Sequence, residues 1–414
     1  MIREFLDIPS EYKLKHIEKK SLLFSFFILF STYPYIFYRI VPLPPVFVLL
    51  ILSCFYIVYY KHMIVRYKSF FKKDLLIVAG IQLLGTYLCM LVNFDFGYCK
   101  QIIYIVWIIV FFKILMLITI KKFLFYYGRI LFFVGLLGVI STILSIVFGV
   151  KPLFEYTNMD GRPGWFVYFT FTNVRVYDII RYSGIFDEAG AFANWVMYYL
   201  IINKIYIKDL KIEKPLIFVT LFTFSFGFYL QLIFYFLFFY LLESRVKTKF
   251  LFLMILPLFI FLFIKLVPED SPIYSLTIGR LGFGSDLNIF EENNRTELSQ
   301  IAKGIYLANP FFGIGITDFS AGVYAADNPY ETLAKDGIIG TLFIYSPLIW
   351  ILFKTHFNRT LFFSTIIIMI GYLHRPFHNN LQHFLMIYIY FCCCYEFYNN
   401  IKREKTSNCL LNKK

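Results

Sequence analysis

Charged residues are scarce in this 414-residue chain. Asp, Glu, Lys and Arg make up 16% of the residues, whereas a soluble domain typically carries about 25%. Several enzyme motifs are also missing: the sequence has no Gly-x-Ser-x-Gly motif, no phosphate-binding loop and no dinucleotide fingerprint. These absences exclude an ordinary soluble domain and give no support to the hydrolase, P-loop and Rossmann classes.

The seven cysteines show no spacing typical of a disulfide framework or a zinc site. Most lie in apolar runs, where we expect them to be buried as small hydrophobic side chains. Two histidines in "HRPFHNN", His374 and His378, are four residues apart. Pro376 between them argues against the continuous helix that such a metal pair needs. We therefore expect no metal and no other cofactor.

Hydrophobic residues, in contrast, make up 59% of the chain, and the mean hydropathy is +0.67. Many apolar runs are close to the length of about 20 residues that crosses a bilayer core. They do not alternate as the strands of a transmembrane barrel do. The sequence predicts an all-α polytopic membrane protein, a single integral membrane domain over 1–414 with about twelve spans. The expected helices are 21–38, 43–60, 74–94, 101–120, 130–150, 190–206, 215–226, 227–243, 250–267, 337–353, 360–373 and 382–398.

Lysine and arginine cluster in short segments between the apolar runs, and the formal net charge is +14. Cytoplasmic loops of membrane proteins carry this basic excess. The basic segments are both termini and residues 61–73, 121–129, 204–214, 243–249 and 354–359. They predict that both termini face the cytoplasm, and the net charge requires no nucleic-acid partner.

Residues 215–242 form an apolar segment with basic residues on both sides, which requires an even number of crossings. The segment is short for two helices at about 1.5 Å per residue. Because "TFSFGF" at 223–228 offers a serine and a glycine for a sharp turn, we expect two short helices. One long tilted helix is the alternative, and it would reverse the orientation of everything downstream.

Two long polar segments, 151–189 and 267–337, fall on the predicted outer side of the membrane. Long loops with many charged residues are more often functional than incidental. Outer arginines also run against the positive-inside trend and need a separate explanation. These arginines are Arg162, Arg175, Arg181, Arg280 and Arg295.

Arg181 lies in "IIRYSGIFDEAG" at 179–190, just before an apolar run, and Arg295 lies in the second outer loop. An arginine held near the membrane surface suits a phosphate or diphosphate group, because its donors match such oxygens in pairs. A salt bridge to a neighbouring acid, such as Asp187 or Glu292, is the structural alternative.

Asp187 and Glu188 stand where the next helix should begin, and carboxylates are stabilised at the positive end of a helix. Helix capping is the structural interpretation of Asp187. Glu188 is a candidate general base, provided that its interfacial setting raises its pKa.

Glycines recur in "NPFFGIGITDF" and "KDGIIGTLF", around a loop that we expect to return into the membrane. Glycine permits close backbone approach and unusual dihedral angles. The positions concerned are Gly313, Gly315, Gly337 and Gly340.

Three motifs carry a family resemblance. "RYSGIFDEAGAFANW" resembles the Arg-x-Ser-Gly-hydrophobic-Phe-x-Glu-Pro-Gly pattern of bacterial polysaccharide polymerases, with Ala189 where proline is common. "RTELSQIAKGIYLANPFFGIGITDF" is similar to their second-loop pattern, and "DNPYETLAKDGIIGTLF" to the segment that follows it. The order of the motifs, the two outer loops and the expected helix count make nearly the whole chain resemble Wzy-type O-antigen polymerases, of the O-antigen polymerase and ligase superfamily.

The resemblance implies a GT-C-like fold and an inverting, metal-independent glycosyltransferase at the outer face of the bacterial inner membrane. The implied donor is an undecaprenyl-diphosphate-linked oligosaccharide. The acceptor is a second lipid-linked repeat unit in polymerases and the lipid A core in ligases. Arg181 and Arg295 match the arginines thought to hold the diphosphate, and a chain-length regulator protein is a candidate partner.

One departure from the family separates polymerase from ligase. Where the ligase pattern has a histidine before Asn-x-Tyr, this chain has Asp327. The difference favours a polymerase of O-antigen, capsule or exopolysaccharide, and leaves Glu188 and Asp327 as candidates to take the acceptor proton. The other expected substrate-binding residues are Tyr182, Asn328, Tyr330 and Arg375.

A flippase or other transporter of lipid-linked sugars is the alternative in another functional class, since it too would have about twelve helices and cationic groups. A flippase should carry its charges near the membrane midplane, facing a cavity. Lys113 and Lys265 are the obvious lysines within apolar runs, and the outer loops hold the other charges. This distribution favours an enzyme, with O-antigen ligase as the nearer alternative.

Overall fold

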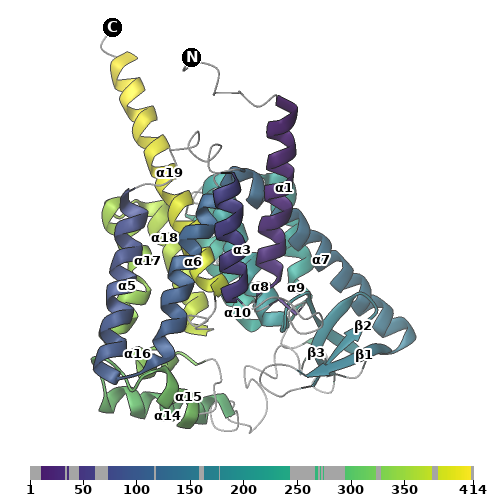
Figure 1. Ribbon diagram of the computed structural model, residues 1–414. Coiled ribbons are helices and arrows are strands. Elements are labelled where there is room, and N and C mark those ends of the chain that lie inside the picture. Colours follow the sequence, from purple (N-terminus) through teal and green to yellow (C-terminus); the bar gives the residue numbers. More distant parts are fainter. Residues whose placement is uncertain are drawn as a thin grey trace.

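The computed structural model describes residues 11–32, 35–36, 46–60, 73–115, 118–157, 163–176, 178–242, 266–268, 271, 274, 294–322, 328–374 and 381–411. These residues are mostly helical, and α1 and α19 emerge at the same end of a helical bundle (Figure 1). Among them, four helices are long and apolar enough to cross a membrane: Lys73–Asn93, Phe96–Leu115, Ile120–Phe148 and Glu331–Lys354. Shorter apolar helices cover Phe47–Tyr59, Phe226–Leu241 and Arg359–Leu373.

The described α-helices are α1 (Glu11–Phe30), α3 (Val46–Tyr59), α5 (Lys73–Asn93), α6 (Cys99–Leu115), α7 (Ile120–Phe148), α8 (Ala189–Ile202), α9 (Leu210–Leu221), α10 (Phe226–Phe236), α14 (Asn294–Ala308), α15 (Ile316–Gly322), α16 (Glu331–Ile344), α17 (Ser346–Lys354), α18 (Arg359–His374) and α19 (Leu381–Leu411). A 3-10 turn, η2 (Phe96–Tyr98), precedes α6, and the π-helical turns η3 (Asn203–Ile207) and η4 (Leu237–Leu241) extend α8 and α10. The helices predicted at 74–94, 190–206 and 360–373 are confirmed by α5, α8 with η3, and α18. The predicted total of about twelve spans goes beyond the four that the described residues contain.

One sequence-based boundary changes. The basic segment 121–129 is not a loop, because α7 begins at Ile120, where the Thr119 hydroxyl accepts a hydrogen bond from the Lys122 amide. Long basic side chains can extend from the first turns of a helix towards water, so charge alone did not end the helix. The helix predicted at 250–267 lies almost entirely outside the described residues.

The two short helices predicted within 215–242 are confirmed. Helix α9 ends at Leu221 and α10 begins at Phe226, with Ser225 in extended conformation as its N-cap. Phe224 has a φ of 49° in the turn between them, which a single long helix could not contain.

The all-α prediction is wrong for the first outer segment, which contains a four-stranded antiparallel sheet. Its strands β1 (Pro152–Thr157), β2 (Pro163–Val167), β3 (Thr170–Val176) and β4 (Ile179–Gly184) pair in sequence order. The segment is rich in aromatic and β-branched residues, which favour strands. The sheet lies alongside the last turns of α7, and β4 packs against both α7 and α8 (Figure 1).

Helix α8 is the centre of the bundle, since all 14 of its residues are buried. Three glycines on α7 allow large side chains to approach closely: Gly128 faces the Tyr199 ring, Gly135 faces Val219, and Gly138 faces Tyr182. Small residues permit this close packing between membrane helices. The strand that carries Arg181 is therefore held against the central core.

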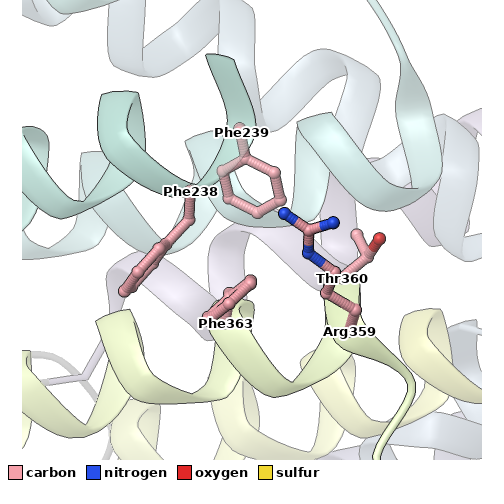
Figure 2. Close-up of a pocket in the computed structure, with 5 residues that line it drawn as sticks. All are labelled: Phe238, Phe239, Arg359, Thr360 and Phe363. Atoms are coloured by element: carbon pink, nitrogen blue, oxygen red, sulfur yellow. The ribbon is translucent and has the colours of Figure 1, made fainter. Parts of the chain in front are cut away.

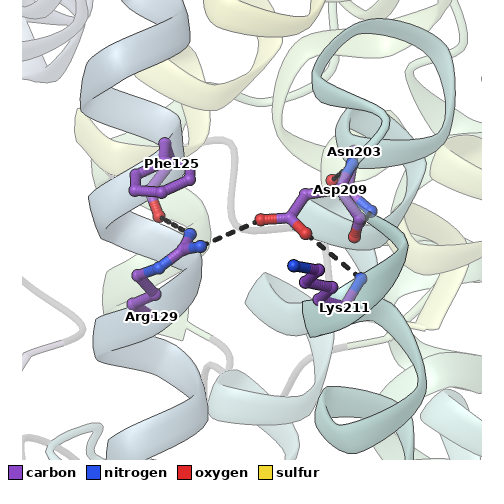
Figure 3. Close-up of polar contacts among 5 residues, drawn as sticks. All are labelled: Phe125, Arg129, Asn203, Asp209 and Lys211. Atoms are coloured by element: carbon purple, nitrogen blue, oxygen red, sulfur yellow. Dashed lines mark hydrogen bonds and ion pairs between the residues drawn. The ribbon is translucent and has the colours of Figure 1, made fainter.

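Ion pairs neutralise several helix ends on the side of the bundle where α1 begins. Lys122 pairs with Glu18 at 2.7 Å, and Lys354 pairs with Asp74 at 3.3 Å. On α7, Arg129 bonds both to the Phe125 carbonyl and to Asp209, whose other carboxylate oxygen accepts the Lys211 amide (Figure 3). These contacts join α1, α5, α9 and α17 to their neighbours.

At the opposite end, the segment 309–315 interlocks with a break in α16 at Gly337, which has a φ of 63° and a ψ of −172°. The amides of Ile314 and Gly315 donate to the carbonyls of Ala334 and Lys335, at 3.0 and 2.9 Å. In return, the amides that follow the break donate to the carbonyls of Pro310 and Phe311, at 2.8 and 3.0 Å.

The close backbone approach predicted at the glycines is confirmed where the segment 309–315 pairs with the break in α16. Gly313, Gly315 and Gly337 all have positive φ. A Cβ atom on Gly337 would lie 2.2 Å from the Phe311 carbonyl carbon, and one on Gly313 would lie 2.3 Å from the Lys335 oxygen. Gly340 instead lies within α16, where it faces Asp336 and the Cys89 sulfur.

We expect Gly337→Ala to lower the free energy of unfolding by about 2 kcal/mol or more, because it combines a left-handed backbone with a backbone clash. Thermal unfolding of the detergent-purified protein, followed by tryptophan fluorescence, measures the change.

Gly304→Ala is the matched control, because Gly304 lies on an exposed face of α14 with open space around it. Alanine favours helix over glycine by about 0.5–1 kcal/mol, so the control should be neutral or stabilising. Equal melting temperatures for the two variants would contradict the role assigned to Gly337.

Candidate functional site

Both motif-bearing regions lie at the end of the bundle away from the start of α1 and the end of α19 (Figure 1). The two ends of helix α5 lie at opposite ends of the bundle (Figure 1). Its first turn carries Asp74, the partner of Lys354, and its last residue, Asn93, donates to the Phe312 carbonyl in the second motif at 3.0 Å. Strand β4, in turn, follows the far end of α7 through the sheet. The two outer segments predicted from the sequence therefore share one end of the molecule.

Arg181 is buried on β4, with 7% of its surface exposed. Its Nε donates to the Thr223 carbonyl in the α9–α10 turn at 3.2 Å, and its own carbonyl accepts the Thr172 hydroxyl. The guanidinium also lies close enough to Tyr229 for its charge to act on the phenol. The arginine is thus oriented by a turn backbone, and its head group faces the junction between the sheet and the α9–α10 pair.

Asp187 and Glu188 immediately precede the buried helix α8. Glu188 is the N-cap residue, with an extended backbone, and its side chain makes no capping hydrogen bond. Asp187, which the sequence suggested as the cap, lies one position earlier and is 9% exposed. Both carboxylates therefore stand at the positive end of the central helix, where a negative charge is stabilised.

Tyr182 belongs to the core. It is completely buried against α7, and its hydroxyl donates to the Val219 carbonyl at 2.6 Å. Burial raises the pKa of the Tyr182 phenol well above its ordinary value, so the hydroxyl stays a neutral donor. Its observed contacts position β4 and leave no ring face for a sugar.

The third motif, "DNPYETLAKDGIIGTLF", contains a turn built by Asn328. Its side-chain oxygen accepts the Tyr330 amide at 3.0 Å, and its carbonyl accepts the Glu331 amide at 3.2 Å. Tyr330 is half-buried and packs with Phe319 and Ala334 in a small cluster beside α14. Helices α14 and α16 are in extensive contact, which brings the helix that carries Arg295 alongside this turn.

Three candidate side chains cannot be placed. Asp327 and Arg375 lie outside the described residues, and Arg295 lies on α14 with a side chain that is also outside them. Their predicted roles stay predictions. Within the described ranges, no three His, Cys, Asp or Glu side chains come together as a metal site would require.

Charged residues that the sequence analysis did not select lie beside the break in α16. Lys335 forms a buried ion pair with Glu331, one helical turn away, and its ammonium lies 5.0 Å from the centre of the Phe319 ring. Asp336 is completely buried, close to Tyr98 in η2 and to Cys89 on α5. The spacing of four residues between Glu and Lys in "ETLAKDG" is the sequence pattern that could have predicted this ion pair.

An aromatic cluster connects the third motif region to α8. Tyr345, at the end of α16, lies 5.2 Å from the Tyr372 ring, and Tyr372 lies 5.8 Å from Tyr198 on α8. The His383 ring packs on Tyr372 at 4.2 Å, and its Nε2 is buried with no hydrogen-bond partner among the described residues. Polar groups inside an apolar bundle often mark function, and a lone histidine in "LQHFLMIY" was the only sequence signal.

Asp95 fixes the outer ends of α5 and α6 to the second motif. Its carboxylate accepts the Thr317 amide at 2.8 Å, the Thr317 hydroxyl at 2.5 Å and the Gly97 amide at 2.7 Å. Burial raises the pKa of Asp95, but these hydrogen bonds outweigh burial, and the net effect is a pKa below the ordinary value.

A lowered pKa means that the ionised carboxylate of Asp95 stabilises the fold. This stabilisation is complete above the unfolded-state pKa of about 3.9 and is lost as the pH falls through the lower folded-state pKa. We expect Asp95→Asn to reduce the free energy of unfolding at pH 7 by about 1–3 kcal/mol. The difference in melting temperature from wild type should shrink below pH 4, and a difference that is constant with pH would contradict the assignment.

We expect Lys335→Met to destabilise the protein by about 3–5 kcal/mol, because it leaves the buried Glu331 charge without its cation. The double variant Glu331→Gln, Lys335→Met should recover most of this loss. Melting temperatures of the single and double variants test the pair, and additive losses would show that the two charges are not coupled.

The chain matches no protein-family model and no curated protein sequence. The assignment of a function therefore depends on the residues and geometry of the chain itself.

Proposed function

We propose that this chain is a glycosyltransferase that polymerises lipid-linked glycan repeat units, of the O-antigen polymerase type. The observation that carries the proposal is a pair of adjoining elements: β4, with the buried and backbone-oriented Arg181, packs against the fully buried helix α8, which begins after Glu188. This contact between β4 and α8 lies at the end of the bundle that also holds the interlocked second motif. The sequence resemblance assigns these same two regions to the reaction.

On the donor side, Arg181 and Arg295 bind the diphosphate of an undecaprenyl-diphosphate-linked oligosaccharide. Arginine suits this role because its planar fork contacts phosphate oxygens in pairs. The bond from Nε to the Thr223 carbonyl orients the Arg181 guanidinium. In the complex, the two Nη groups would contact phosphate oxygens and stabilise the charge that develops as the diphosphate leaves.

On the acceptor side, a hydroxyl of a second lipid-linked repeat unit attacks the anomeric carbon of the donor. The new C–O bond forms as the bond to the diphosphate breaks, with inversion. Glu188 or Asp327 takes the hydroxyl proton. The place of Glu188 at the start of the fully buried helix α8 supports this role.

The finer architecture belongs to the same proposal: a GT-C-like protein of about twelve spans in the bacterial inner membrane, with both termini in the cytoplasm. The common end of α1 and α19 supports a shared side for the termini (Figure 1). A chain-length regulator protein is a candidate partner. The product is O-antigen, capsule or exopolysaccharide.

A transporter is less well supported. Its membrane charges should face a cavity. The buried charges in α16 are instead closed off by protein, since the Lys335 and Glu331 side chains are 3% and 8% exposed. Asp327, in place of the histidine of the ligase pattern, argues against a ligase.

Arg181→Ala and Arg295→Lys should abolish or strongly shorten the polymer ladder in cells that supply the lipid-linked repeat unit, because each weakens diphosphate binding. Glu188→Gln should slow elongation by about 100-fold or more if it removes the general base. Polymer length is measured by gel electrophoresis, with membrane insertion quantified in parallel.

Arg403→Ala is the matched arginine control, because Arg403 is exposed in the last third of α19. Helix α19 ends at the opposite end of the bundle (Figure 1). Normal polymer length in both site arginine variants, at normal insertion, would contradict the diphosphate role. With purified lipid-linked repeat unit, a polymerase elongates the substrate alone. A ligase requires lipid A core, and a flippase leaves the repeat unit chemically unchanged.

A further inference from the structure

A small pocket lies between α10 and α18, away from the proposed transferase site. Its lining consists of Phe238, Phe239, Arg359, Thr360 and Phe363. Figure 2 shows the Arg359 guanidinium directed between the rings of Phe239 and Phe363, with the Thr360 side chain beside it. The pocket thus combines one cation and one hydroxyl with aromatic walls.

The pocket lies where several apolar helices end. Phe238 and Phe239 are near the end of the apolar segment Phe226–Leu241, and Arg359 is the first residue of Arg359–Leu373. The candidate span Glu331–Lys354 ends only five residues before Arg359, and its Lys354 pairs with Asp74 at the start of α5. This position corresponds to the membrane–water boundary at the end of the bundle where α1 begins.

Arg359 differs from other basic residues at this end of the molecule. Lys122, Arg129 and Lys354 each pair with an acid. Arg359 is exposed, its guanidinium lies 5.8 Å from the Phe363 ring centre, and no acid pairs with it among the described residues. Among the described residues, the pocket therefore presents a positive charge with no paired acid to an anionic ligand.

The aromatic lining of the pocket favours a lipid over a free anion as the ligand. Phe238 and Phe363 stack at 4.2 Å and form an apolar surface beside the cation. Phe353, near the end of α17, and Phe357, in the turn before α18, are 65% and 50% exposed and contact each other edge to face, with ring centres 5.3 Å apart. Exposed aromatic rings are typical of the interfacial zone of a bilayer, where acyl chains meet head groups.

We propose that this pocket binds the head group of an anionic phospholipid. The Arg359 guanidinium and the Thr360 hydroxyl contact the phosphate, and the rings of Phe238 and Phe363 contact the upper part of an acyl chain. Basic side chains at the cytoplasmic surface are attracted to anionic lipids in this way. The lipid would hold α10 and α18 together, and this site does not depend on the proposed transferase activity.

The test uses the full chain, purified in neutral detergent and stripped of lipid. Phosphatidylglycerol, phosphatidylcholine and inorganic phosphate are titrated separately, with the thermal unfolding midpoint as the readout. We expect phosphatidylglycerol to raise the midpoint of the wild type. Arg359→Ala should increase the phosphatidylglycerol concentration needed for half the effect by about tenfold, because a charge-assisted hydrogen bond is lost.

Arg359→Lys keeps the charge but lacks the paired donors, so its response to phosphatidylglycerol should fall less than that of Arg359→Ala. It also tests the site if Arg359→Ala does not fold. Arg403→Ala removes an exposed arginine elsewhere and should respond like the wild type. Equal responses of wild type and both Arg359 variants, an equal effect of phosphatidylcholine, or an equal loss in Arg403→Ala would overturn the proposal. Stabilisation by inorganic phosphate at the same concentrations would assign the pocket to a free anion instead of a lipid.

Discussion

The backbone pairing between residues 309–315 and the break in α16 is the contact on which the end of the molecule opposite the start of α1 depends. A helix that breaks inside a membrane protein leaves amides and carbonyls that lipid cannot satisfy. Here the carbonyls of Ala334 and Lys335 accept amides from the opposing segment, and the amides after Gly337 donate back to it. The break is therefore stable only while this segment is in place, and the segment is fixed in position by the break.

This pairing also determines where the charges of the third motif lie. The Lys335 carbonyl accepts the Gly315 amide and the Tyr98 hydroxyl, while its ammonium pairs with Glu331. Asp95 holds the next residues, through Thr317, to the ends of α5 and α6. Because these contacts are made together, the loop, the broken helix and the α5–α6 connection form one unit beside α14.

The sequence predicted those features that follow from local chemistry. The apolar runs predicted α5, α8 and α18, and "TFSFGF" predicted the α9–α10 turn. The glycines predicted the close backbone approach between 309–315 and the break in α16. Each of these features depends on side-chain hydropathy or on the freedom of a glycine backbone, which the sequence displays directly.

The failures came from features that depend on tertiary partners. The sheet was missed because aromatic and β-branched residues are common throughout this chain, so a strand of 5 to 7 residues does not stand out. Tyr182 was expected at the substrate, but the absence of a side chain at Gly138 gives its ring a place in the core. The sequence did not identify Lys335 and Asp336 as buried charges. Charged residues beside a break in a helix have the same sequence pattern as the polar end of a loop.

Charged side chains have different partners at the two ends of the bundle, and this difference relates the proposed site to the lipid pocket. Where α1 begins, acids such as Glu18, Asp74 and Asp209 each neutralise a base at a helix end. At the far end, the carboxylates of Asp187 and Glu188 stand at the positive end of α8, near an arginine oriented by a backbone carbonyl. An end where several bases pair with acids suits anchoring in a bilayer, and Arg359, which no described acid pairs with, is the residue proposed to recruit a lipid there. An end where cation and carboxylate are positioned by the backbone is suited to bind a diphosphate and to accept a proton.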